Sequence, residues 1–252
     1  MEKNIYLLKS GLSCEDIKKS LGELIKDKSN LNVLRKNISL NNNITNNGAC
    51  EMLLLKKNQK LKNIFNEDTI VFTSADDIES GLIFASNFNI NNIYPILNLS
   101  DKKSLKKLRD VKDYKDHYGK SNNVSKYWDT DFGLKKFNIE LINIKNNLPK
   151  ISWKYFNGKY LSDYKRFSLS KYFKFLKEIL DTNIQYKTIV FIGNNKFINE
   201  FLKKSKNPNF NKKKDIIEYS SIYELNIGIN RNITVNSFEK IFTPAALREI
   251  PF

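Results

Sequence analysis

The chain has 252 residues and a formal net charge of +16 at pH 7, because 43 Lys and Arg residues outnumber 27 Asp and Glu residues. Its residues are 40% apolar and 12% aromatic, which excludes a disordered polypeptide and is enough for one full hydrophobic core. No apolar run approaches the roughly 20 residues of a membrane-spanning helix and the first residues lack a cleavable signal pattern, so we expect a soluble, cytoplasmic protein without a membrane span.

Short apolar strands alternate with amphipathic helices over the first hundred residues, which is typical of an α/β domain with a mostly parallel sheet flanked by helices. The first pair is a strand at 4–8 (NIYLL) and a helix at 13–27 (SCEDIKKSLGELIKD). Next, the sequence predicts a helix that starts at Thr45 or Asn46 and runs through GACEMLLLKKNQKL, a strand at 69–74, a helix at 76–88 and a strand at 91–98.

Residues 101–160 carry much charge and little periodicity, so we expect an inserted, largely surface subdomain at about 101–160 without a strand. Regular patterns return after it. They predict a helix over 166–180 with an apolar stripe, a buried strand at 187–193, a helix at 195–204 and late strands at 215–227 and 232–242.

The cysteines and the single histidine favour no metal or cofactor site. Cys14 and Cys50 are too few for a disulfide framework and lack the paired spacing of a zinc site, so we expect buried thiols. His117 lies inside the charged insertion, where a solvated surface histidine is the expected role. We therefore predict no metal, cofactor or catalytic histidine.

Four separated stretches resemble, in the same order, motifs of the histidine phosphatase superfamily, whose fold phosphoglycerate mutases and acid phosphatases share. YLLKSG places Lys9, Ser10 and Gly11 where the family has Arg-His-Gly at the end of its first strand. NITNNGACEM is similar to the family's Leu-Thr-x-x-Gly-x-x-Gln-Ala helix start and retains Thr45 and Gly48.

The third and fourth stretches each combine a strand later in the sequence with the turn and helix start that follow it. IVFTSADDIESGLIFA is similar to a family strand with Ser-Ser-Pro-x-x-Arg-Ala, and TIVFIGNNKFINEFL to a strand with Ser-His-Gly-Gly. YSSIYEL afterwards resembles the family's closing strand. The resemblance implies one three-layer α/β sandwich over 1–252, with the charged region as an insertion.

The resemblance also implies a histidine nucleophile, a second histidine and two arginines around the phosphoryl group. This sequence instead has Ser10 at the nucleophile, Lys9 beside it, Ile78 at the second arginine and Asn194 at the second histidine, with Asp16 for a family asparagine. Phosphoryl transfer needs a suitable nucleophile and fixed positive donors. Ile78 offers neither charge nor a bidentate fork, and Asp16 would repel phosphate.

Our preferred hypothesis is a catalytically inactive histidine-phosphatase-like protein, not an enzyme, that acts as a structural or interaction module with protein partners. Asparagine, isoleucine and lysine share A/T-rich codons, which fits an A/T-rich genome such as that of a large DNA virus or an A/T-rich protist. For a viral protein, we expect either a component of the virus particle, located in the virion, or a role in host interaction.

Two alternatives remain open. The Lys-rich stretches at 56–62, 101–112 and 203–214 favour a protein that binds nucleic acid or another polyanion, although the scarcity of arginine argues against base readout. A residual anion-binding sensor or weak phosphatase would use the vestigial phosphate pocket. That pocket comprises Lys9, Ser10, Gly11, Asp16, Thr73, Ser74, Ile78 and Asn194.

Overall fold

The computed structural model describes residues 4–13, 44–74, 77–96, 143–144, 147–155, 169–182, 185–194, 197–199, 218–229 and 233–244. Several predictions lie outside these residues: the helix at 13–27 beyond its first residue, Cys14, Asp16, His117 and the Lys-rich stretches at 101–112 and 203–214.

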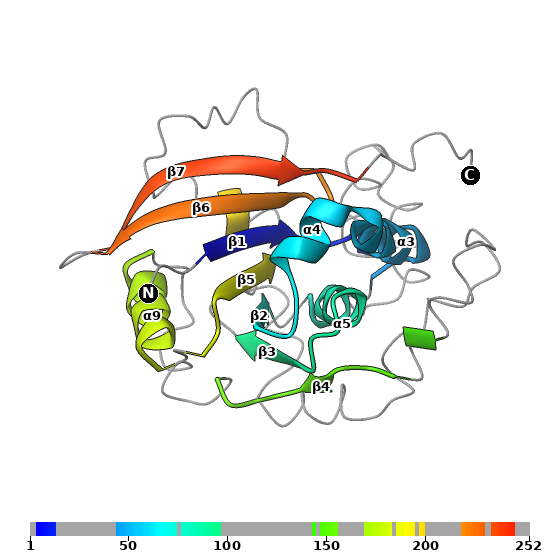
Figure 1. Cartoon of the computed structure of the whole chain (residues 1–252), viewed down its shortest axis with the longest axis horizontal. Coiled ribbons are helices and arrows are strands. Elements are labelled where there is room, and N and C mark those ends of the chain that lie inside the picture. The colour runs from blue at the N-terminus through cyan, green and yellow to red at the C-terminus, as the bar shows by residue number, and fades with distance from the viewer. Residues whose placement is uncertain are drawn as a thin grey trace, which may run out of the picture.

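One sheet organises the described part of the chain, with its seven strands in the order β4-β3-β2-β5-β1-β6-β7 (Figure 1). The pairs from β4 to β1 are parallel, whereas β6 and β7 add antiparallel strands at one edge. The strands are β1 (Asn4–Lys9), β2 (Thr69–Ser74), β3 (Asn92–Ile96), β4 (Lys150–Ile151), β5 (Thr188–Gly193), β6 (Ile222–Ile229) and β7 (Ile233–Phe242).

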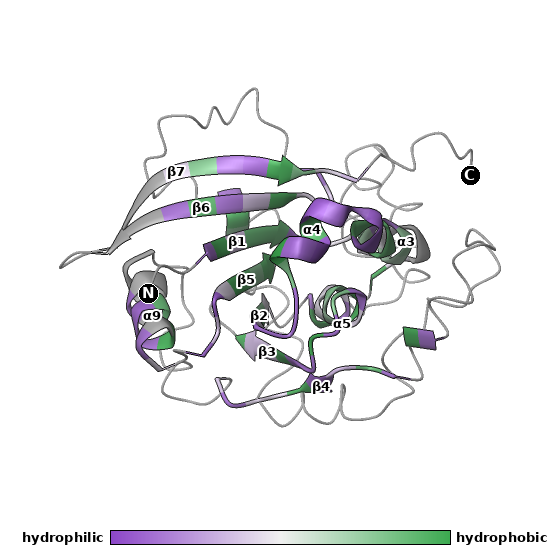
Figure 2. Cartoon of the chain, viewed as in Figure 1, coloured by the Kyte–Doolittle hydropathy of each residue, from purple (hydrophilic) through white to green (hydrophobic). Residues whose placement is uncertain are grey.

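Helices cover both faces of the sheet, which confirms the predicted three-layer α/β fold. Tyr6 and Leu8 of β1 face a core built with α3 (Asn46–Leu54), η1 (Leu55–Lys57), α4 (Gln59–Ile64) and α5 (Ile78–Asn87). Their neighbours Ile5 and Leu7 face α9 (Leu169–Thr182) on the other side. β2 and β5 are buried along their whole length, and their middle residues are apolar, as the green of β5 in Figure 2 shows.

The predicted helix that starts near Thr45 is interrupted where the sequence showed one continuous pattern. Asn58 is extended, with φ −84° and ψ 115°, so α3 and η1 end before it and α4 begins after it. Its side-chain oxygen accepts a hydrogen bond from the Leu61 amide at 3.1 Å and caps α4. The extent of the helical region was predicted, and its division was not.

Near the end of the predicted insertion, the structure has a short strand and a buried aromatic residue where the sequence predicted no strand. Lys150 and Ile151 form β4 beside β3. Tyr155 is buried, with its ring centroid 5.5 Å from that of Phe72. A two-residue strand is too short to produce a periodic pattern, so it could not be predicted from the sequence.

None of the helices that the structure describes is long and apolar enough to cross a membrane.

Candidate functional site

Three parallel strands end side by side at the place where the sequence predicted the vestigial pocket. Ser10 follows β1, Ser74 ends β2 and Asn194 follows β5. Lys9 pairs with Gly193 in the sheet register, and the Ser10 amide donates to the Gly193 carbonyl at 3.0 Å. Sites in parallel α/β sheets form at this carboxyl end, so the fold brings the first and last predicted motifs together.

Buried polar residues gather at this end of the sheet. Of the twelve buried polar or charged residues in the described part, only Thr69 and Thr188 lie at the opposite strand ends. The other ten form what we call the polar cluster: Lys9, Ser10, Ser13, Thr73, Ser74, Asp77, Glu79, Ser80, Ser220 and Ser221.

Lys9 lies at the centre of the cluster with no exposed surface. Its Nζ donates to the carbonyl and the Oγ of Ser10 at 3.3 and 3.2 Å. The same Nζ lies 4.2 Å from the centroid of the Tyr219 ring, a distance suited to a cation–π contact. The ammonium group is therefore engaged by neighbouring protein groups.

The first turn of α5 supplies polar groups to neighbouring segments. Asp77 accepts a hydrogen bond from the Ser74 hydroxyl at 2.5 Å, and Ser80 Oγ accepts one from the Gly11 amide at 3.3 Å. Glu79 is only 3% exposed, and its Oε2 accepts from the Ile44 amide at 2.8 Å. Two buried carboxyl groups thus lie beside the predicted phosphate pocket.

Sequence reasoning missed Asp77, Glu79 and Ser80 as site residues. The acids at the start of the 76–88 helix have an ordinary explanation, since they complement the helix dipole. Their partners are distant along the chain, and Glu79 bonds to a residue 35 positions away. A possible signal was the density of acids and hydroxyls directly after the buried strand, in the stretch TSADDIES.

Three residues of the predicted pocket have structural roles. Ile78, the first residue of α5, is completely buried and packs in the hydrophobic core. The Cγ2 of Thr73 lies 2.2 Å from the position that a Cβ on Gly81 would occupy, which places Thr73 against α5. Asn194 Oδ1 accepts from the Phe197 amide at 3.1 Å and caps the turn after β5.

The turn after β1 packs directly on the start of α3. Thr45 Oγ1 donates to the Leu12 carbonyl at 2.9 Å and accepts from the Gly48 amide at 3.0 Å. A Cβ on Gly11 would lie 2.7 Å from the Gly48 carbonyl oxygen, and a Cβ on Gly48 would lie 2.4 Å from the Leu12 carbonyl oxygen. Both glycines are needed for this close approach, which links the first two motifs of the resemblance.

The segment before β6 closes the polar cluster. The Ser221 carbonyl accepts a hydrogen bond from the Lys9 amide at 2.9 Å, and the Ser220 amide donates to the Ser10 carbonyl at 3.5 Å. Ser220 has a positive φ of 57°, and its buried Oγ has no hydrogen-bond partner in the part of the chain that the structure describes. The stretch that resembles the family's closing strand therefore contacts the nucleophile position directly.

Among the described residues, Tyr6 is held as a phenol and no metal site is formed. Tyr6, on β1, donates to Glu224 at 3.1 Å. Burial and, secondarily, the Glu224 charge raise the pKa of Tyr6 above that of an exposed tyrosine, so the phenol stays protonated at neutral pH. No group of three His, Cys, Asp or Glu residues in the described segments could hold a metal ion.

Comparison with known proteins finds no match among family models and none among curated sequences. Solved structures do match across almost the whole chain. A phosphoserine phosphatase from Entamoeba histolytica is 14% identical, with coverage of 94% of this chain and 96% of its own and a TM-score of 0.45.

Two further solved structures are also similar to this chain. The ecdysone phosphate phosphatase from Bombix mori is 12% identical, covering 96% and 93% of the two chains at a TM-score of 0.48. The Rv3214 protein from Mycobacterium tuberculosis is 11% identical, covering 98% and 99% at a TM-score of 0.44. These are likenesses alone, with identities between 11% and 14% and TM-scores below 0.5.

Proposed function

We propose that this chain is a catalytically inactive protein with a histidine-phosphatase-like fold, and that it acts as a structural or interaction module. The observation that carries the proposal is how the polar groups at the strand ends are used. Lys9 bonds to Ser10, Ser74 bonds to Asp77, and Asn194 caps a turn. These groups hold neighbouring segments together where the resemblance implies that they would hold a phosphoryl group.

The nucleophile position supports the same proposal. Ser10 is only 1% exposed, so a phosphomonoester has little access to its hydroxyl. The buried acids Asp77 and Glu79 would oppose the negative charge of an incoming phosphate. The chain has a single histidine, His117, whereas the resemblance implies two. Neither of the two histidine positions holds a histidine, because Ser10 and Asn194 occupy them.

A phosphatase assay tests the proposal. We expect purified protein to hydrolyse p-nitrophenyl phosphate and phosphoserine no faster than a Ser10→Ala variant, because Ser10 is covered and already bonded to Lys9. Circular dichroism of both proteins controls for folding. Wild-type activity that the Ser10→Ala change abolishes would overturn the proposal.

Tungstate binding separates the inactive module from a residual anion sensor. Saturable stabilisation of the wild-type protein by tungstate, lost in Ser10→Ala, would favour the sensor. No stabilisation would favour the inactive module. The sensor requires Lys9 and the nearby hydroxyls to exchange their present partners for an anion.

A cytoplasmic or virion location and the identity of protein partners stay predictions.

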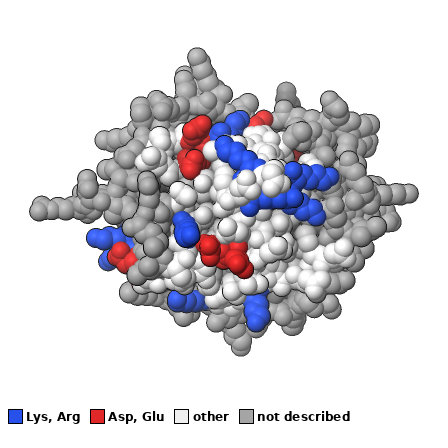
Figure 3. All heavy atoms as spheres, viewed as in Figure 1, with Lys and Arg blue, Asp and Glu red and all other residues white. Residues whose placement is uncertain are grey.

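A second candidate function, polyanion binding, is favoured by one surface feature. Four lysines of η1 and α4 form a patch that Figure 3 shows as a group of blue side chains. Three of them, Lys57, Lys60 and Lys62, are exposed, and Lys56 is partly so. Lysine ammonium groups attract phosphates without reading base sequence.

Salt dependence of binding tests this candidate. If all four lysines contact phosphates, the affinity for double-stranded DNA should fall with a log–log salt slope of about −3.6, which is about 0.9 for each contact. A triple change of Lys57, Lys60 and Lys62 to glutamine should remove most of that slope. Lys174→Gln on α9 is the matched control, since its side chain is also exposed. An unchanged slope in the triple variant would exclude this patch as the binding surface.

A further inference from the structure

A second polar cavity lies away from the polar cluster. It has a volume of about 710 Å³ and is bounded by η1, by the end of α5 with the turn before β3, and by residues 143–150. Asn92 in its wall is the first residue of β3, whereas the polar cluster lies at the last residues of the parallel strands. The two sites therefore lie at opposite ends of the strands.

Asparagine is concentrated in the wall of this cavity. Five of the 13 lining residues are asparagines, while the whole chain has 35 in 252 residues, or about one in seven. An A/T-rich composition alone would place about two there, so the enrichment is local. The five are Asn89, Asn91, Asn92, Asn143 and Asn147.

Most of these carboxamides remain available to a ligand. The side chains of Asn89, Asn91 and Asn92 make no hydrogen bond within the part of the chain that the structure describes. Asn147 Nδ2 donates to the Asn143 carbonyl at 3.2 Å, which leaves the Asn147 Oδ1 as an acceptor. A carboxamide offers both a donor and an acceptor, and these match the hydroxyl groups of a polyol.

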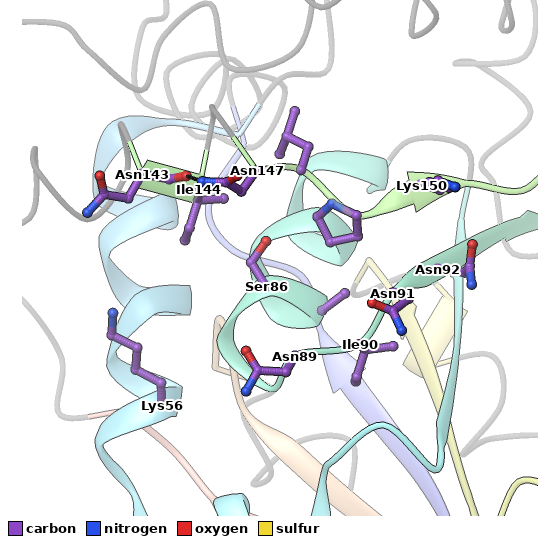
Figure 4. Close-up of a pocket in the computed structure, with 13 residues that line it drawn as sticks. Lys56, Ser86, Asn89, Ile90, Asn91, Asn92, Asn143, Ile144, Asn147 and Lys150 are labelled. Atoms are coloured by element: carbon purple, nitrogen blue, oxygen red, sulfur yellow. Dashed lines mark hydrogen bonds between the residues drawn. The ribbon is translucent and has the colours of Figure 1, made fainter.

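Ser86 provides an independent indication that the wall is made for a ligand. Ser86 lines the cavity, and its Oγ is buried without a hydrogen-bond partner in the described part of the chain, so a rotation about χ1 is needed to bring the hydroxyl to a ligand. Buried polar atoms are almost always hydrogen-bonded, so such a hydroxyl calls for an external partner. Figure 4 shows Ser86 on α5 between the asparagines of the 143–150 segment and those before β3.

The charges around the cavity have one sign. Lys56 and Lys150 lie on opposite sides in the view of Figure 4, and no Asp or Glu is among the described residues of the wall. Ile90, Ile144 and Leu148 add apolar surface that suits the carbon–hydrogen face of a sugar ring. The volume falls within the usual range for small-molecule sites.

The wall is also held in place by backbone hydrogen bonds. The Lys150 amide donates to the Asn91 carbonyl at 2.9 Å, which joins two of the three segments. The Asn147 amide donates to the Ile144 carbonyl at 3.0 Å. A wall fixed in this way loses little conformational freedom when a ligand binds, which favours affinity.

We propose that this cavity binds a small phosphorylated sugar. The asparagine carboxamides and Ser86 bond to its hydroxyl groups, and Lys56 and Lys150 attract its phosphate. This site does not depend on the polar cluster, so binding here is compatible with an inactive phosphatase fold, and each proposal can fail without the other.

Calorimetric titration of the full chain with glucose 6-phosphate tests the proposal. We expect saturable binding that is tighter than binding of glucose or inorganic phosphate, because only the phosphorylated sugar uses both the amides and the lysines. Shifts of asparagine side-chain amide resonances in NMR spectra should accompany it. No saturable binding at millimolar concentration, or equal affinity for inorganic phosphate, would overturn the proposal.

Two variants and a control localise the binding. Lys150→Gln should weaken it about fivefold by removing one ionic contact. Ser86→Ala should weaken it by a similar factor, about fivefold, while leaving thermal stability unchanged, because the hydroxyl has no described partner to lose. Lys174→Gln on α9 should bind as the wild type does. Equal weakening by Lys174→Gln and Lys150→Gln would show diffuse charge attraction and overturn the proposal.

Discussion

Replacing Ile78 by arginine should lower the free energy of unfolding by about 3–5 kcal/mol. Ile78 begins α5 and is completely buried among apolar side chains of the core. A guanidinium group there would lose its hydration, and the neighbouring carboxyl groups of Asp77 and Glu79 already accept hydrogen bonds from Ser74 and Ile44. This is the position at which the resemblance implies a phosphate-binding arginine.

Urea unfolding followed by circular dichroism measures this effect. Ile78→Val is the matched control and should cost only about 0.5–1.5 kcal/mol, because it removes one methylene from the same environment. An Ile78→Arg variant as stable as Ile78→Val would mean that the new side chain reaches solvent or the polar cluster. That result would bring this position back into the candidate pocket.

The Ile78 prediction bears on whether phosphatase chemistry could be restored. An arginine that unfolds the core cannot be added alone to complete a phosphate site. Lys9 presents a comparable obstacle, because its ammonium already contacts Ser10 and Tyr219. Rebuilding the chemistry would require repacking of α5 together with the strand ends. The differences from the family motif are thus integrated into the packing of this fold.

Elements with a strong local pattern were predictable from the sequence. The central strands carry short apolar runs, IVF and IVFI, because both of their faces are buried, and these runs became the middle of β2 and β5. The start of α3 was predicted at Thr45 or Asn46 because threonine is a favourable helix cap, and Thr45 does cap it.

Features that depend on distant residues were not predictable. The Glu79 carboxylate bonds to Ile44, 35 residues away, and Gly11 bonds to Ser80, 69 residues away. Tyr155 enters the core after a strand of two residues. The asparagine-lined cavity is built from three separated segments, so no single window of sequence contains it.

Replacing Gly48 by alanine should lower the free energy of unfolding by about 3 kcal/mol, at the upper end of the usual cost of overpacking. Alanine is the better helix former by up to about 1 kcal/mol. The new Cβ, however, would lie 2.4 Å from the Leu12 carbonyl oxygen and 2.6 Å from the Leu12 nitrogen. Both atoms belong to the backbone of the turn after β1, which can move only if the turn separates from α3.

Gly193→Ala is the control for the Gly48 prediction, since its Cβ would meet the Phe197 ring, with the nearest atom, Cδ1, at 2.5 Å. A side chain can rotate away, so we expect a smaller loss than for Gly48→Ala in the same urea titration. Equal losses would mean that the turn after β1 yields as easily as a side chain. The expected inequality would assign Gly48, together with Gly11 and Thr45, a packing role that does not depend on any chemistry at Ser10.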